Sequence, residues 1–224
     1  MPNELIWILF MLLDMTMVLF MYKKFGRVGL FAIIPFSLIC ANLQVVKQMD
    51  LFGIATTAGN IMYSSVFLAT DLISEHYGKK SARQAVALGF ITLVLFVAYM
   101  QIALLFETNS HDFAQPALET IFGFVPRIVA ASMLAYIVSQ AHDVWAFHLI
   151  KERTGDKMLW LRNNASTMVS QLLDTTVFCV VAFWGVFPFE VFLEISISTY
   201  IMKVIVAACD TPFMYLAQRI RPEG

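Results

Sequence analysis

Apolar runs of about twenty residues alternate with short polar connections along the whole chain. An α-helix needs about 20 apolar residues to cross a hydrocarbon core that is about 30 Å thick. The pattern therefore predicts an all-α, polytopic membrane protein without a separate soluble domain. The seven predicted spans are 5–22, 28–46, 52–73, 84–106, 121–148, 165–187 and 191–217.

Lysine and arginine gather in every second connection between these runs. The connections on the cytoplasmic side of a membrane protein carry the excess of these residues, so the pattern predicts the orientation. Strict alternation through seven spans places the N-terminus outside and the C-terminus in the cytoplasm. The basic residues in question are Lys23, Lys24 and Arg27, then Lys79, Lys80 and Arg83, then Lys151, Arg153, Lys157 and Arg162, and finally Arg219 and Arg221; the other connections contain only Lys47.

Composition supports the membrane assignment and excludes some partners. The 224 residues are 59% hydrophobic and 14% charged, whereas soluble domains contain about 25% charged residues. A net charge of −1 gives no basic surface for nucleic acid. The three cysteines lie in apolar runs and form no C-x-x-C motif, so we expect neither a disulfide framework nor a redox site.

Two consecutive predicted helices carry polar side chains along one side. Segments 139–147 and 170–178 share the pattern Ser-Gln-x-x-Asp-x-x-x-Phe. Residues three and four apart lie on one helix face, so each helix presents a polar stripe, and the two stripes are expected to face each other. The stripes comprise Tyr136, Ser139, Gln140, Asp143 and Phe147 on one helix, and Thr167, Ser170, Gln171, Asp174 and Phe178 on the next.

The last predicted helix adds an ammonium and a further carboxylate. Tyr200, Lys203 and Asp210 follow helical spacing, and Lys203 is expected near the bilayer midplane together with Asp174. Ionisable residues at this depth usually face the bundle interior or a solute pathway. Lys203 therefore either belongs to such a pathway or serves as a structural counter-ion for Asp174 or Asp210.

The third predicted helix carries two carboxylates near its cytoplasmic end. Asp71 and Glu75 are four residues apart and share a face. They either contribute to the solute pathway or form interfacial pairs with Lys79, Lys80 or Arg83. Both interpretations fit the sequence equally well.

Two further polar residues are set apart from the site. Asp14 stands alone in the first helix and is interpreted as a structural contact. His142 is expected to point away from the stripe that contains Asp143, and no second ligand follows it at metal-binding spacing. We therefore predict no metal and no cofactor.

Four separated motifs resemble the queuosine precursor transporter family, also called the vitamin uptake transporter family. They are FLATDLISEHYGKKSAR at 67–83, PRIVAASMLAYIVSQAHDVWAF at 126–147, LWLRNNASTMVSQLLDTTVFCVVAFWG at 159–185 and YIMKVIVAACDTPFMY at 200–215. The resemblance covers residues 28–217 and implies a six-helix core, with residues 1–24 forming an additional N-terminal helix. It further implies import of 7-cyano-7-deazaguanine or 7-aminomethyl-7-deazaguanine across the bacterial inner membrane for tRNA modification.

A guanine-like solute agrees with the polar side chains of the predicted helices. Its adjacent N–H donors suit a carboxylate, Asp174 or Glu75, and its carbonyl suits the amide of Gln140 or Gln171. Aromatic side chains can stack on its flat ring. The predicted substrate-binding residues are Asp174, Gln171, Asp143, Gln140, Glu75, Asp71, Tyr136, Phe178, Tyr200, Lys203 and Asp210.

Two other functional classes compete with a self-sufficient transporter. One is the substrate-binding subunit of an energy-coupling-factor vitamin importer, although the run 28–46 lacks an Ala-x-x-x-Ala pair. The other is an intramembrane enzyme, but the chain contains no G-x-G-D, Walker A or H-E-x-x-H motif. We therefore expect no enzymatic activity. A bundle of this size is also compatible with a homodimer.

Overall fold

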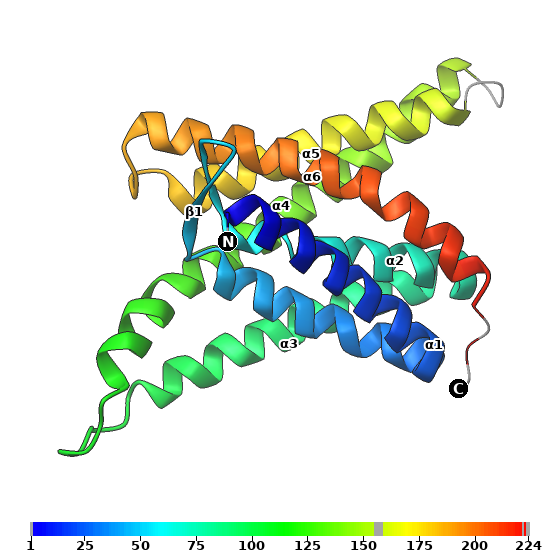
Figure 1. Cartoon of the computed structure of the whole chain (residues 1–224). Helices are drawn as coiled ribbons and strands as arrows, with labels where there is room; N and C mark the ends of the chain where they lie inside the picture. The colour runs from blue at the N-terminus through cyan, green and yellow to red at the C-terminus, as the bar shows by residue number, and fades with distance from the viewer. Residues whose placement is uncertain (1, 155–158, 221, 223–224) are drawn as a thin grey trace.

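A bundle of helices forms the protein, for which a computed structural model describes residues 2–154, 159–220 and 222. Within these residues the helices are α1 (Asn3–Gln44), α2 (Tyr63–Tyr77), α3 (Lys79–Ala103), α4 (Gln115–Thr154), α5 (Leu159–Phe183) and α6 (Phe189–Gln218) (Figure 1). Between α1 and α2 lie the strands β1 (Gln48–Leu51) and β2 (Ile54–Thr57) and the short 3-10 helix η1 (Ala58–Asn60).

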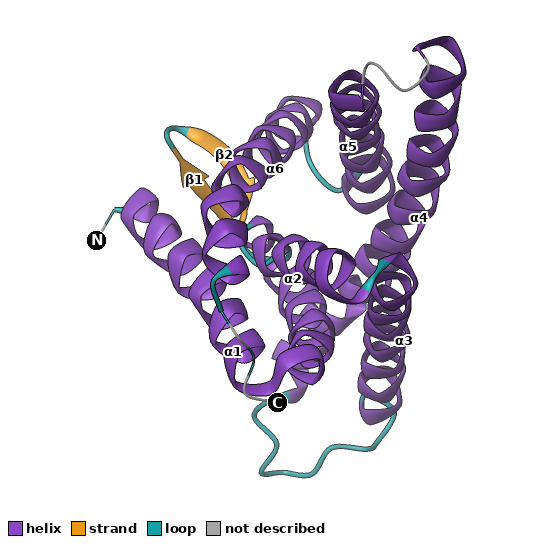
Figure 2. Ribbon diagram, turned by 90° about the vertical axis from the view of Figure 1, so that its right-hand side faces the viewer, coloured by secondary structure: helices purple, strands orange, loops and turns teal. Residues whose placement is uncertain are grey.

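Helix α1 consists of two halves that run in opposite directions. The chain reverses at Gly26, whose backbone angles (φ 55°, ψ −131°) are non-helical. Glycine adopts positive φ without steric cost. The two halves then lie side by side as a hairpin (Figure 2). They correspond to the separate predicted helices 5–22 and 28–46.

The predicted helix over 52–73 is wrong in its first part. Strands β1 and β2 pair antiparallel, with Leu51 opposite Ile54. Phe52 and Gly53 form the two-residue turn, both with positive φ (52° and 76°), as the favoured hairpin turns require. Only from Tyr63 onward is the segment helical, and α2 is 15 residues long.

The remaining predicted helices fall on α3 to α6, with ends that differ by several residues. Helix α3 begins at Lys79 rather than at 84, and α4 extends the predicted run 121–148 at both ends. Helix α5 starts before 165 and ends before 187, while α6 contains all of 191–217. The order of helical segments in the sequence was thus predicted more accurately than their boundaries.

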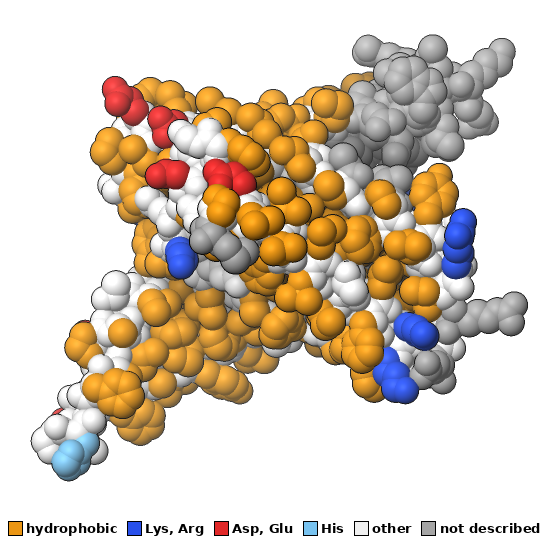
Figure 3. Space-filling model, in the orientation of Figure 1, with side chains coloured by type: hydrophobic (Ala, Val, Ile, Leu, Met, Phe, Trp, Pro, Cys, Tyr) orange, Lys and Arg blue, Asp and Glu red, His pale blue; other side chains and the backbone are white. Residues whose placement is uncertain are grey.

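The outer surface of the bundle is apolar, as expected for contact with lipid. Three helical stretches of the described residues are long and apolar enough to cross a membrane: Asn3–Gln44, which is the α1 hairpin, Lys79–Ala103 and Gln115–Ser139. Hydrophobic side chains also cover most of the face shown in Figure 3. The chain is therefore an all-α, multi-pass membrane protein, with one β-hairpin among the residues that the structure describes.

The connections divide between the two ends of the bundle. The reversal within α1, the junction of α2 and α3, the facing ends of α4 and α5 and the C-terminus lie at one end (Figure 1). Most of the visible Lys and Arg side chains gather there (Figure 3). The β-hairpin, the α3–α4 connection and the α5–α6 connection lie at the opposite end (Figure 1).

An arginine near that opposite end ties α4 to the end of α5. The Arg127 side chain donates from Nε to the Val181 carbonyl oxygen and from Nη2 to the Trp184 carbonyl oxygen, each at 2.7 Å. The last carbonyls of a helix have no partner within the helix. Arg127 supplies two of the missing donors.

Replacing Arg127 by methionine should therefore destabilise the protein. One hydrogen bond to a charged group contributes about 1.5–3 kcal/mol. Arg127 makes two such bonds but is exposed to solvent, which weakens both. We therefore expect the substitution to lower the free energy of unfolding by about 2 kcal/mol in total. The midpoint of thermal denaturation in detergent would report the loss. Arg83→Met, at another exposed arginine, is the matched control, and equal effects of the two substitutions would contradict the proposed tie.

Candidate functional site

The polar stripes of α4 and α5 meet between these two antiparallel helices. Ser139 on α4 donates to Asp174 Oδ1 on α5 at 3.4 Å. Further along the same contact, His142 Nδ1 lies 3.0 Å from Ser170 Oγ. His142 was predicted to point elsewhere, and its contact with Ser170 corrects that prediction. The expected facing of the two stripes is confirmed for these described residues.

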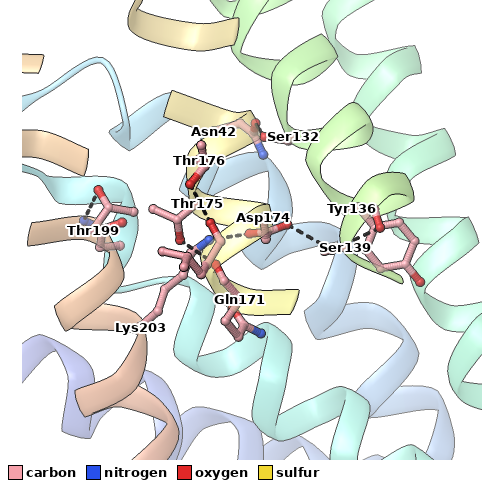
Figure 4. Close-up of polar contacts among 12 residues, drawn as sticks. Asn42, Ser132, Tyr136, Ser139, Gln171, Asp174, Thr175, Thr176, Thr199 and Lys203 are labelled. Atoms are coloured by element: carbon pink, nitrogen blue, oxygen red, sulfur yellow. Dashed lines mark hydrogen bonds and ion pairs between the residues drawn. The ribbon is translucent and has the colours of Figure 1, made fainter. Parts of the chain in front are cut away.

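Asp174 forms an ion pair with Lys203 of α6. The Lys203 ammonium donates to Asp174 Oδ2. Figure 4 shows Lys203 and Ser139 on opposite sides of the carboxylate, so that α4, α5 and α6 converge on Asp174. The sequence had left open whether Lys203 pairs with Asp174 or with Asp210. The structure establishes the pair with Asp174.

The aromatic ring of Tyr63 lies over the other side of the ammonium. Lys203 Nζ is 5.4 Å from the centre of this ring, within the range of a cation–π interaction. Tyr63 is the first residue of α2, so α2 joins the other three helices at this point. The ammonium thus has two kinds of partner, a carboxylate and an aromatic face.

The two members of the ion pair differ in exposure. The Lys203 side chain is 5% exposed and the Asp174 side chain is 23% exposed. Charges removed from water are tolerated only when they are well paired. Lys203 therefore depends on its partners, whereas part of the Asp174 side chain remains uncovered by protein.

Gln171 lies one helical turn before Asp174 on α5. Its side-chain oxygen Oε1 is buried, and none of the described residues donates a hydrogen bond to it. Buried polar atoms without a partner are uncommon and carry a free-energy cost. An N–H group of a bound solute would satisfy this oxygen.

The three predicted aromatic residues have different surroundings. Phe178 is buried in an apolar cluster, where its ring meets Phe183 edge-on at 5.7 Å. Tyr136 is half-buried and its ring lies 5.0 Å from Phe90. Tyr200 is half-buried on α6. In this conformation Phe178 is part of the packing beneath Asp174 and is closed to a solute.

The two predicted carboxylates of α2 lie away from the ion pair. Asp71 and Glu75 are eight and twelve residues beyond Tyr63, or roughly 12 and 18 Å along the helix. Both are exposed. Within the described part of the chain neither forms an ion pair with Lys79, Lys80 or Arg83, so the predicted interfacial pairing is not seen.

Three predicted site residues have side chains outside the described residues. They are Gln140 and Asp143 on α4 and Asp210 on α6. Among the side chains that are described, no group of three or more His, Cys, Asp or Glu residues is arranged to hold a metal ion.

Sequence analysis missed a second layer of buried polar contacts around the site. Ser132 of α4 donates to Asn42 Oδ1 of α1 at 2.8 Å. Asn60 of η1 lies 3.4 Å from Thr199 Oγ1 of α6. Asn42 could have been identified from the sequence, because a polar amide inside the apolar run 28–46 indicates a buried hydrogen bond. Tyr63 had no such signal, because it lies in the middle of the predicted span 52–73, where an aromatic residue among apolar ones is ordinary.

Comparison with known proteins gives a consistent result. A family model described as "Putative vitamin uptake transporter" matches residues 57–217. A "Probable queuosine precursor transporter" of Bacillus subtilis (strain 168) is 49% identical over 221 residues, covering 98% of this chain and 96% of the relative. The "Queuosine precursor transporter" of Escherichia coli (strain K12) is 30% identical over 189 residues, covering 83% and 82%. No solved structure matches the chain significantly.

Proposed function

The chain belongs to the vitamin uptake transporter family, and on this basis we propose that it imports queuosine precursors across the bacterial inner membrane. The solutes would be 7-cyano-7-deazaguanine or 7-aminomethyl-7-deazaguanine. The names of the Bacillus and Escherichia relatives support this solute class. The Lys203–Asp174 ion pair inside an apolar bundle is the structural observation that supports a binding site.

The ion pair matches the edge of a guanine-like ring. That edge presents two N–H donors beside a carbonyl acceptor. Asp174 would accept the two donors in a bidentate way, and the Lys203 ammonium beside it would donate to the carbonyl. The unpartnered oxygen of Gln171 would accept a further N–H of the solute. The carbonyl is thereby assigned to Lys203 instead of the glutamines that the sequence suggested.

A bound solute would replace part of the internal ion pair. Lys203 pairs with Asp174 in this structure, and the donor edge of the solute would compete for the same carboxylate. The Tyr63 ring keeps a favourable contact with the ammonium while Asp174 turns to the solute. Asp174 and Lys203 would thus each have a partner both with and without a bound solute.

The distribution of charges supports seven spans with the N-terminus outside. The reversal in α1, the α2–α3 junction and the C-terminus lie at one end of the bundle (Figure 1). Basic residues flank these connections, as expected for the cytoplasmic side. In this arrangement the β-hairpin lies at the outer mouth. The additional helix 1–24 then forms the first span.

Uptake by the purified chain in proteoliposomes tests the proposal. We expect saturable uptake of labelled deazaguanine precursor, with which excess guanine competes through the shared edge and unrelated vitamins compete poorly. Uptake by the chain alone would also exclude the importer-subunit alternative, which requires separate ATPase subunits. An imposed pH gradient distinguishes proton coupling from facilitated diffusion. Absence of both binding and uptake of deazaguanines would refute the proposed solute.

Asp174→Asn should reduce precursor uptake about tenfold or more while membrane expression is retained. The amide keeps one acceptor atom but loses the charge and the bidentate geometry that make such hydrogen bonds strong. Initial uptake rates at matched protein levels would measure the effect. Thr176→Val, at an exposed threonine of the same helix, is the control, and normal uptake by Asp174→Asn would remove Asp174 from the site.

A further inference from the structure

Helix α2 begins inside the protein, where its first N–H groups lack water. The 3-10 helix η1 leads directly into it, and the residues around its start, Ile61, Met62, Ser64 and Ser65, are all buried. The first four N–H groups of a helix have no acceptor within the helix. A helix that starts in the interior therefore requires an acceptor from elsewhere in the fold.

Asp14, in the first half of α1, provides this acceptor. Its Oδ2 atom accepts a hydrogen bond from Ser64 Oγ at 2.8 Å and another from the Ser65 backbone N–H at 3.2 Å. A carboxylate at a helix N-terminus is stabilised by the N–H donors and by the helix dipole. Ser65 Oγ also contacts Ser37 Oγ at 2.7 Å, so both halves of α1 hold the start of α2.

Position in the chain links this buried carboxylate to the transport site. Ser64 directly follows Tyr63, whose ring lies over the Lys203 ammonium. Lys203 in turn pairs with Asp174. A continuous series of contacts therefore runs from α1 through α2 and α6 to α5. A shift in the start of α2 moves the Tyr63 ring relative to Lys203.

Contact with solute does not explain Asp14. The residue is 5% exposed, and its Oδ2 atom already accepts two hydrogen bonds from α2. The same half of α1 holds the other end of the 48–65 segment as well. There Asn3 Nδ2 donates to the Asp50 carbonyl oxygen and the Phe52 N–H donates to Glu4 Oε1, each at 3.0 Å. The first half of α1 thus supports the β-hairpin and the start of α2 together.

We infer that Asp14 is a positioning residue, which fixes the start of α2 and thereby holds the Tyr63 ring over Lys203. For transport this inference rests on the proposed function, because Lys203 and Asp174 then form the solute site. The first helix lies outside residues 57–217, which the family model matches. By this inference it nevertheless contributes to solute binding.

Binding measurements on the full chain in detergent test the inference. Asp14→Leu should raise the dissociation constant for 7-cyano-7-deazaguanine about tenfold, because the Tyr63 ring would no longer be held beside Lys203 when the solute binds; tenfold corresponds to about 1.4 kcal/mol. Asp14→Asn should restore most of the affinity, because its amide oxygen can still accept from Ser65. Thr16→Val, at an exposed residue of the same helix, should match the parent.

A double-mutant cycle with Tyr63 distinguishes positioning from general destabilisation. If Asp14 acts through Tyr63, Asp14→Leu should have little further effect on affinity in a Tyr63→Leu background. Independent effects would multiply instead, and that result would overturn the inference. Parental affinity in a folded Asp14→Leu variant would overturn it as well.

A second cycle needs no ligand. Thermal midpoints of Asp14→Leu, Lys203→Met and the double variant should be non-additive, because Asp14 binds Ser64 and Ser65 at the start of α2 and Lys203 contacts the ring of Tyr63 in the same turn. Additive shifts would overturn the inference whether or not a deazaguanine binds. Non-additive shifts in a protein that binds no deazaguanine would instead support the inference and refute the proposed solute.

Discussion

Asp174→Leu is expected to lower the free energy of unfolding by about 3–5 kcal/mol, the cost of breaking a buried ion pair at one member. The substitution leaves the Lys203 side chain, which is 5% exposed, without its carboxylate, and among the described residues the Tyr63 ring is then the remaining partner of the ammonium. Denaturation of the purified protein in detergent, followed by circular dichroism, would measure the loss. Lys203→Met should cost less, because Asp174 is more exposed and keeps its contact with Ser139.

The double variant Asp174→Leu/Lys203→Met provides the decisive control. Replacing both members of a buried pair by apolar residues is often neutral or stabilising. We therefore expect the double variant to be more stable than Asp174→Leu while uptake remains lost. A double variant as unstable as Asp174→Leu would show that the leucine itself, and not the unpaired ammonium, causes the destabilisation.

Gly29→Val is expected to destabilise the α1 hairpin by about 3 kcal/mol or more, at the upper end of the cost of overpacking. A Cβ atom on Gly29 would lie 2.8 Å from the carbonyl carbon of Met21 and closer still to its oxygen. These two atoms belong to the backbone, which cannot move away by a rotamer change as a side chain can. Yield of folded protein and the thermal midpoint would report the effect.

Gly123→Ala is the matched control for this glycine. It also lies in a helix, but a Cβ atom there would meet nothing within 4 Å. Alanine favours a helix over glycine by about 1 kcal/mol, so this variant should be as stable as the parent or slightly more stable. Parental stability of Gly29→Val would contradict the close approach of the two α1 halves.

Sequence alone predicted the helices well because lipid imposes a length on apolar runs. The same criterion misread 52–73, since an apolar strand followed by a buried helix forms one continuous apolar run. Phe52-Gly53 and the β-branched residues Ile54, Thr56 and Thr57 were the local signals for a hairpin turn and a strand. The length of the apolar run nevertheless led to the prediction of one helix over 52–73.

The candidate site was predictable where it depends on spacing within a helix. Periodicity placed Ser139 and Asp174 on facing stripes, and depth placed Lys203 near Asp174. Neither periodicity nor depth could predict the contacts of Tyr63 or Asp14, because these contacts arise from packing between helices that are distant in sequence. Asp14 was set aside for lack of a neighbour, yet its donors follow 50 and 51 residues later.

This separation has a consequence for how the protein is made. The two halves of α1 reverse at Gly26 and leave the ribosome well before Ser64 and Ser65 are synthesised. During that interval the Asp14 carboxylate has no α2 donors, and an unpaired charge within lipid is costly. We therefore expect the first hairpin to remain beside the insertion machinery until the start of α2 has been synthesised and can donate to Asp14.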